Sequence, residues 1–160
     1  MSVKWKSRTS WRAKLEKPQE PRIVDVPSRM QQTWGKGRML IATPMLIDEI
    51  VRRIPKGRLA TVAQIMERLA RDHKCDSTCP MTTGIFLRIV AETAEEDMAA
   101  GKKRIAPYWR VLKSDGSLNE RYPGGVNQQA GHLRSEGHKI VFRKPDKARV
   151  EGYEARQAKL

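Results

Sequence analysis

Hydrophobic side chains recur every three or four residues in three central segments of the chain, and this spacing predicts three helices. The first begins at Thr43 and Pro44, because threonine is a good N-cap and proline is tolerated at the first helical position. The capping box Thr61-x-x-Gln64 opens the second, and the third begins near Pro80. Their apolar faces consist of Leu46, Ile47, Ile50, Val51 and Ile54; of Val62, Ile65, Met66 and Leu69; and of Ile85, Phe86, Ile89, Val90 and Ala94.

The spacing changes after the third helix. The runs YWRVL and SLNERY flank Ser114-Asp115-Gly116, and Asp-Gly between such runs predicts a β-hairpin over residues 108–120. In a strand, Tyr108 and Trp109 would lie on opposite faces. A last helix is expected over 126–135 with Gly137 as its cap, followed by a closing strand or extended tail in HKIVFRK.

These elements predict an α+β fold. Residues 1–35 show little periodicity and are expected to form an extended arm, in which Trp5, Trp11 and Trp34 could contact the surface or a partner. Two helices, a long helix and a hairpin are the pattern of a mainly helical winged helix-turn-helix domain with a short hairpin. Residues 61–71 would be its supporting helix and 80–94 its recognition helix. The boundaries are a basic arm over 1–40, the domain over 41–143 and a basic tail over 144–160.

Charge points to a polyanionic partner. The chain has 160 residues and a formal net charge of +14, with the excess concentrated in residues 1–40 and 132–160. Nucleic acid is the common partner of such a protein, although basic ends can also serve solubility alone. No apolar run is long enough to cross a membrane, and the N-terminus lacks the apolar stretch of a secretory signal. A cytoplasmic protein is expected, associated with the nucleoid if the source is bacterial.

One cluster has metal-ligand residue types. His73, Cys75 and Cys79 precede the long helix, but zinc prefers four ligands and a fourth is not evident nearby. Two cysteines do not make a disulfide scaffold. We therefore expect no metal site, no cofactor and a structural thiol at Cys79.

Four motifs carry a resemblance to a known family. IPKGRLATVAQI, PYWRVLKSDGSL, YPGG and LRSEGHKI occur in the order and rough spacing of the alkylguanine-DNA alkyltransferase active-site domain, over about residues 43–141. In that family a Pro-Cys-His-Arg motif carries the cysteine that accepts the alkyl group, and a glutamate supports the histidine. Tyr108 and Trp109 occupy the cysteine and histidine positions here, and Glu136 matches the glutamate. A phenol with a pKa near 10 and an indole cannot accept an alkyl group in this way.

The chain thus resembles the non-catalytic alkyltransferase-like proteins. The resemblance implies that it binds duplex DNA as a monomer, holds an alkylated guanine out of the helix and flags it for excision-repair proteins. Aromatic walls suit a flipped base, and the implied pocket residues are Tyr108, Trp109, Tyr122 and Glu136. Alternatively, Tyr108 and Trp109 could simply pack in the core. The implied DNA-binding residues are Arg58, Thr61, Val62, Gln64, Met81, Thr82, Thr83 and Arg110.

The sequence departs from the family at the residues that flip the base. Val62 stands where the family has tyrosine, and Met81 stands where it has the arginine that fills the gap left by the flipped base. A methionine can wedge between base steps. Four acids within residues 92–97 would repel phosphate if they faced it. The alternative function is a general DNA-binding or protein-interaction module that has lost base flipping.

Overall fold

The structure is a computed structural model that describes residues 9–160, so Trp5 lies outside the described residues. The helices are α1 (Trp11–Glu16), α2 (Gln31–Trp34), α3 (Pro44–Arg52), α4 (Val62–Asp72), α5 (Pro80–Ala99) and α6 (Gly125–Ser135). The strands are β1 (Arg22–Asp25), β2 (Arg38–Ile41), β3 (Ala60–Thr61), β4 (Ser77–Thr78), β5 (Val111–Leu112), β6 (Ile140–Lys144) and β7 (Lys147–Val150). Three short 3-10 helices are η1 (Ser28–Met30), η2 (Tyr108–Arg110) and η3 (Tyr153–Arg156).

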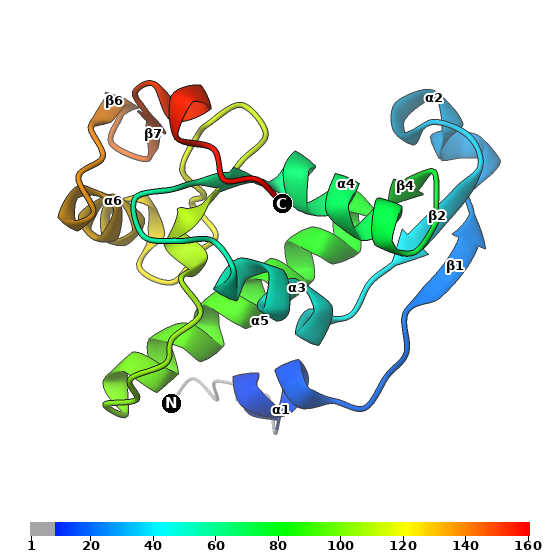
Figure 1. Ribbon diagram of the computed structural model, residues 1–160, viewed down its shortest axis with the longest axis horizontal. Helices are drawn as coiled ribbons and strands as arrows, with labels where there is room; N and C mark the ends of the chain where they lie inside the picture. The colour runs from blue at the N-terminus through cyan, green and yellow to red at the C-terminus, as the bar shows by residue number, and fades with distance from the viewer. Residues whose placement is uncertain (1–8) are drawn as a thin grey trace, which may run out of the picture.

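Helices occupy the middle of the molecule and small sheets lie toward its ends. In Figure 1, α3, α4 and α5 are central, α6, β6 and β7 gather at one end, and β1, β2, β4 and α2 gather at the other. The sheets have the strand orders β1-β2-β4, β3-β5 and β6-β7. This mixture of helices and short strands agrees with the expected α+β class.

The predicted helices begin and end where their local signals lie. The Thr43 side chain accepts a hydrogen bond from the Leu46 amide at the start of α3. Both halves of the Thr61–Gln64 capping box form at the start of α4. Gly137 follows α6 with a φ of +90°, a conformation that glycine adopts without steric cost. Capping is a local interaction, which is why the sequence alone locates these ends.

The predicted hairpin over 108–120 is wrong. Tyr108–Arg110 form the 3-10 helix η2, and β5 pairs in parallel with β3, with Ala60 opposite Val111. The turn at Asp115-Gly116 exists, but the chain beyond it pairs with β7, where the Leu118 amide donates to the Ala148 carbonyl. Both residues of β5 are fully buried, so their backbone finds its partner in the core instead of at a surface hairpin.

The expectation of an extended arm is wrong for residues 9–35. Trp11–Glu16 form α1, whose N-cap Ser10 accepts a hydrogen bond from the Ala13 amide and whose Leu15 is buried in the main core. β1 follows and pairs antiparallel with β2. The weak periodicity of this segment conceals its structure because α1 is short and depends on packing against the rest of the molecule.

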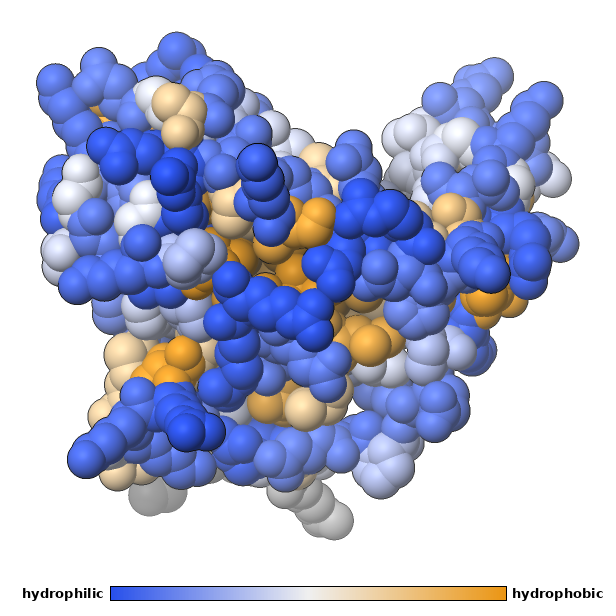
Figure 2. Space-filling view, viewed as in Figure 1, coloured by the Kyte–Doolittle hydropathy of each residue, from blue (hydrophilic) through white to orange (hydrophobic). Residues whose placement is uncertain are grey.

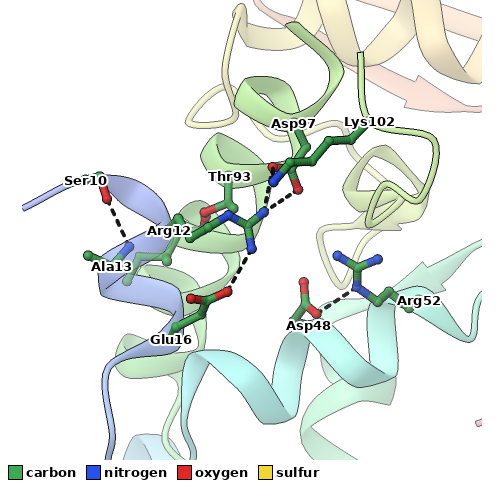
Figure 3. Close-up of polar contacts among 10 residues, drawn as sticks. Ser10, Arg12, Ala13, Glu16, Asp48, Arg52, Thr93, Asp97 and Lys102 are labelled. Atoms are coloured by element: carbon green, nitrogen blue, oxygen red, sulfur yellow. Dashed lines mark hydrogen bonds and ion pairs between the residues drawn. The ribbon is translucent and has the colours of Figure 1, made fainter. Parts of the chain in front are cut away.

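An ion-pair network fastens α1 to the second half of α5. The Arg12 guanidinium donates two hydrogen bonds to the Asp97 carboxylate, at 2.5 and 2.6 Å, and also contacts Glu16 (Figure 3). Lys102 reaches Asp97 at 3.3 Å. Burial alone would raise the pKa of Asp97, but the hydrogen bonds and charges of Arg12 and Lys102 outweigh it and lower that pKa. Asp97 therefore stays ionised while buried.

The expected basic tail over 144–160 is also folded. It contains β7, the last residue of β6 and η3, and the last residues return to the centre beside α4 (Figure 1). The Leu59 amide donates to the Arg156 carbonyl, and the Ala158 amide donates to the Leu59 carbonyl. Gln64 donates its side-chain amide to the Ala158 carbonyl at 3.0 Å.

Leu15→Ala tests whether α1 belongs to the folded core. Removing a side chain that is 2% exposed leaves a cavity under α1, and we expect the free energy of unfolding to fall by about 2–4 kcal/mol. Urea denaturation followed by circular dichroism measures it. Lys17→Ala, at an exposed position just after α1, is the control and should change stability by less than about 0.5 kcal/mol. Equal stability of the two variants would contradict the packing of α1.

Candidate functional site

The first turns of α5 carry an exposed apolar pair. Met81 is 63% exposed and Ile85 is 55% exposed, and their spacing of four residues places them on one face of the helix. Hydrophilic side chains cover most of the face shown in Figure 2, with apolar side chains visible only in patches. An exposed apolar pair on a largely hydrophilic protein makes the start of α5 a candidate for contact with a partner.

A cavity of about 690 Å³ adjoins this pair. It lies between the first half of α5, α1 and the segment 113–122 that follows β5. Its lining is mostly apolar, with the charged residues at the edges. These are Lys14, Arg88, Lys113, Arg121 and Glu120, and the Glu120 carboxylate pairs with Lys113 at 2.7 Å. Four cations against one carboxylate make this cavity attractive to an anionic ligand.

Tyr108 lies behind the cavity in the core. It is 0% exposed, its hydroxyl donates to Glu95 on α5, and its ring meets Trp109 and Tyr122 edge to face. Burial raises the pKa of Tyr108, and the hydrogen bond to Glu95 raises it further. The phenol is therefore neutral in the physiological range and is no nucleophile.

Trp109 is half-buried beside Tyr108. Its ring stacks on His132 of α6, with centroids 4.3 Å apart, and its indole nitrogen is buried. The strand alternation expected for Tyr108 and Trp109 does not hold, because both residues belong to the 3-10 helix η2. Their rings instead contact one another at a centroid distance of 5.4 Å.

Arg110 and Glu136 form a buried ion pair. Their closest atoms, Arg110 Nη2 and Glu136 Oε2, are 2.6 Å apart, and the side chains are 13% and 6% exposed. Arg110 also donates to the Ile54 carbonyl after α3. Burial alone would raise the pKa of Glu136, but the hydrogen bonds and charge of Arg110 outweigh it and lower the pKa. The pair joins the end of α3, η2 and the end of α6.

Of the four predicted pocket residues, Tyr122 lines the cavity. Its hydroxyl donates to the Val111 carbonyl at 3.2 Å, which fixes the ring against β5. The preceding segment is held by the buried Gln129 of α6, whose side-chain oxygen accepts from the Asn119 amide while its nitrogen donates to the carbonyls of Trp109 and Val111. The loop over residues 119–122 is thus anchored at Asn119 by Gln129 and at Tyr122 by Val111.

The predicted DNA-binding residues divide by exposure. Met81 and Arg58 are exposed, whereas Thr61 and Thr83 are buried and use their hydroxyls within the protein, Thr61 as the N-cap of α4 and Thr83 as a donor to the Cys79 carbonyl. Val62, Gln64 and Thr82 are partly exposed, and the Arg110 side chain is only 13% exposed. Met81 therefore lies at the cavity, while Arg110, Thr61 and Thr83 serve the fold.

Sequence reasoning missed several residues that line the cavity. Lys14 lies outside the motifs that carry the resemblance, Arg121 lies in an irregular loop, and Trp11 is expected from the sequence only as a contact to the surface or a partner. The sequence pattern assigns Ile85 to the apolar face of its helix, yet Ile85 is 55% exposed, and its spacing of four residues from Met81 is the signal that could have identified it. Among residues 9–160, no group of three or more His, Cys, Asp or Glu is arranged to hold a metal ion.

The arrangement of elements has counterparts among solved structures. No protein-family model and no curated protein sequence matches the chain. A structure of S. pombe Atl1 in complex with damaged DNA containing O6-carboxymethylguanine has a TM-score of 0.53, and one of S. pombe ATL in complex with DNA has a TM-score of 0.51. In both cases 19% of the residues are identical, and the match covers 73% of this chain and 94% of the other. At this identity the likeness concerns the fold.

Arg110→Met tests the buried ion pair. The variant leaves a buried carboxylate without its cation, so we expect the free energy of unfolding to fall by about 3–5 kcal/mol near neutral pH. Because the pKa of Glu136 is lowered in the folded state, the stabilisation is full above the unfolded pKa of about 4.3 and is lost as the pH falls through the lower folded value.

The difference in the free energy of unfolding between wild type and Arg110→Met should therefore become smaller as the pH falls below about 4. Denaturation curves recorded from pH 7 to pH 3 measure it. Arg104→Met removes an exposed arginine and serves as the control. A variant as stable as this control at pH 7 would mean that the pair does not form.

Proposed function

We propose that the protein binds duplex DNA, with α4 and α5 acting as a helix-turn-helix and the first half of α5 entering a groove. The observation that carries this proposal is the exposed pair Met81 and Ile85 beside a cavity rimmed with cations. The fold shared with the DNA-bound structures of S. pombe Atl1 and the net charge of +14 support it.

The distribution of charge along α5 supports the same orientation. Residues 80–91 contain no carboxylate and one arginine, whereas all four acids of the helix lie in residues 92–97. Three of these acids have partners within the protein: Glu92 pairs with Arg88, Glu95 accepts from Tyr108, and Asp97 binds Arg12. The half of α5 that faces DNA in this proposal thus presents no negative charge to the phosphates, and the positive end of the helix dipole lies there.

We further propose that the cavity receives a modified guanine turned out of the duplex. Met81 would act as the wedge that occupies the vacated space, as apolar side chains do in other DNA-bending proteins. The ring of Tyr122 and the apolar side chains around it would hold the base.

The protein would not transfer the alkyl group. The residue at the nucleophile position, Tyr108, is buried and neutral, and its hydroxyl is already bound to Glu95. The protein would then act as a monomer in the cytoplasm, as a marker of the lesion for excision-repair proteins.

A general DNA-binding protein is the second candidate. Tyr108, Trp109 and Glu136 do not line the cavity, so the pocket is less aromatic than the resemblance implies. Binding without preference for a modified base is the outcome that would favour this candidate.

Fluorescence anisotropy on two duplexes that differ by one 6-O-methylguanine tests the proposal. We expect wild type to bind the modified duplex more tightly, and Met81→Ala to reduce this preference about tenfold, because the wedge contributes only when a base leaves the stack. Met45→Ala is the matched control, since Met45 is an exposed methionine on α3, outside the cavity. Equal binding of both duplexes by wild type would contradict lesion recognition, and no binding to either would contradict DNA binding.

A further inference from the structure

Helix α1 supplies one wall of the cavity. Trp11 and Lys14 line it together with Met81, Ile85 and Arg88 of α5. Residues 11–16 lie outside the region that carries the family motifs, so nothing about that resemblance places them at a binding site. The wall is nevertheless a fixed part of the folded molecule, since α1 packs along α5.

Two cations share the indole ring of Trp11. The Lys14 ammonium is 4.4 Å from the ring centroid, and the guanidinium carbon of Arg88 is 5.7 Å from it. Each contact is favourable, but the two positive charges repel one another. Glu92 neutralises Arg88 only partly, because the closest atoms of this pair are 3.7 Å apart and Arg88 is 55% exposed. An anion bound beside the ring would relieve this repulsion.

The position of Lys14 is set before any ligand arrives. Helix α1 is held by the bonds from Arg12 to Asp97 (Figure 3), and its Leu15 side chain is buried in the core. The indole then restrains the Lys14 side chain at the cavity edge. A lysine held in this way loses less conformational entropy on binding than a free surface lysine does.

We propose that Lys14 and Arg88 bind one phosphodiester group of the DNA strand whose base enters the cavity, and that Trp11 positions the two cations. This inference rests on the DNA-binding function proposed above and adds a contact from α1 to it. A nucleotide joins a flat, largely apolar base to an anionic phosphate, and the site joins an apolar cavity to a pair of cations at its edge. The net charge of the whole rim is also positive, because Lys113 and Arg121 outnumber Glu120.

The salt dependence of DNA binding by Lys14→Ala tests this contact. Lys14→Ala removes one of the two cations at this phosphate, so fewer counterions are released on binding and the slope of log Kd against log salt should fall by up to about one. We expect affinity near 0.1 M salt to fall about fivefold on modified and unmodified duplexes alike, because a phosphate contact carries no base information. Lys17→Ala removes the same charge from an exposed position outside the cavity and should leave the slope unchanged.

Two Trp11 variants test whether an aromatic ring at this position is what holds Lys14 and Arg88 in place. Trp11→Phe keeps an aromatic ring and should retain most of the affinity, whereas Trp11→Ala should lower affinity and slope as Lys14→Ala does. Thermal denaturation of each variant confirms that α1 remains docked. If wild type binds DNA but Lys14→Ala and Lys17→Ala have the same slope, the phosphate site is wrong and the DNA-binding proposal stands. If wild type binds neither duplex, the DNA-binding proposal itself fails.

Discussion

The burial of the middle of α5 is the constraint on which the rest of the structure depends. Leu87, Val90 and Ala91 are almost inaccessible to solvent, and α1, α3, α4 and η2 all pack against this helix. Twenty residues at 1.5 Å per residue give a rod about 30 Å long, enough to cross a domain of this size. Its first turns carry the exposed side chains that line the cavity, and its second half carries Asp97, which binds Arg12 of α1, and Glu95, which accepts from Tyr108. The first turns of this helix therefore line the cavity, and its second half holds neighbouring elements in place.

The sequence predicts those elements whose signals are local. Thr43, Thr61 and Gly137 mark helix ends because a cap requires only nearby backbone groups. The pairing of β3 with β5 escapes prediction, because each strand has two residues and the partners are about fifty positions apart. Helix α1 is not predicted for a related reason. Six residues have little helical stability of their own, and the burial of Leu15 in the core stabilises the helix.

The candidate site was predictable only in part, because a motif gives the order of residues along the chain but not how deeply each is buried in the fold. The resemblance implies roles for Met81 and Tyr122, and both residues line the cavity. It could not reveal that Tyr108 is buried against Glu95, or that Arg110 and Glu136 neutralise one another inside the protein. The cations at the cavity edge come from separate segments, α1, α5 and the loop before α6, and only the folded chain assembles them.

The return of the C-terminal segment to α4 has a consequence for folding kinetics. Gln64 and Ala158 are 94 residues apart along the chain, and the backbone bonds between Leu59 and residues 156–158 span a similar separation. Closing so long a loop costs entropy before its contacts form, and contacts of high sequence separation slow folding. We therefore expect residues 156–160 to dock late in folding, and we expect their release to expose the start of α4 while the packing around α5 persists.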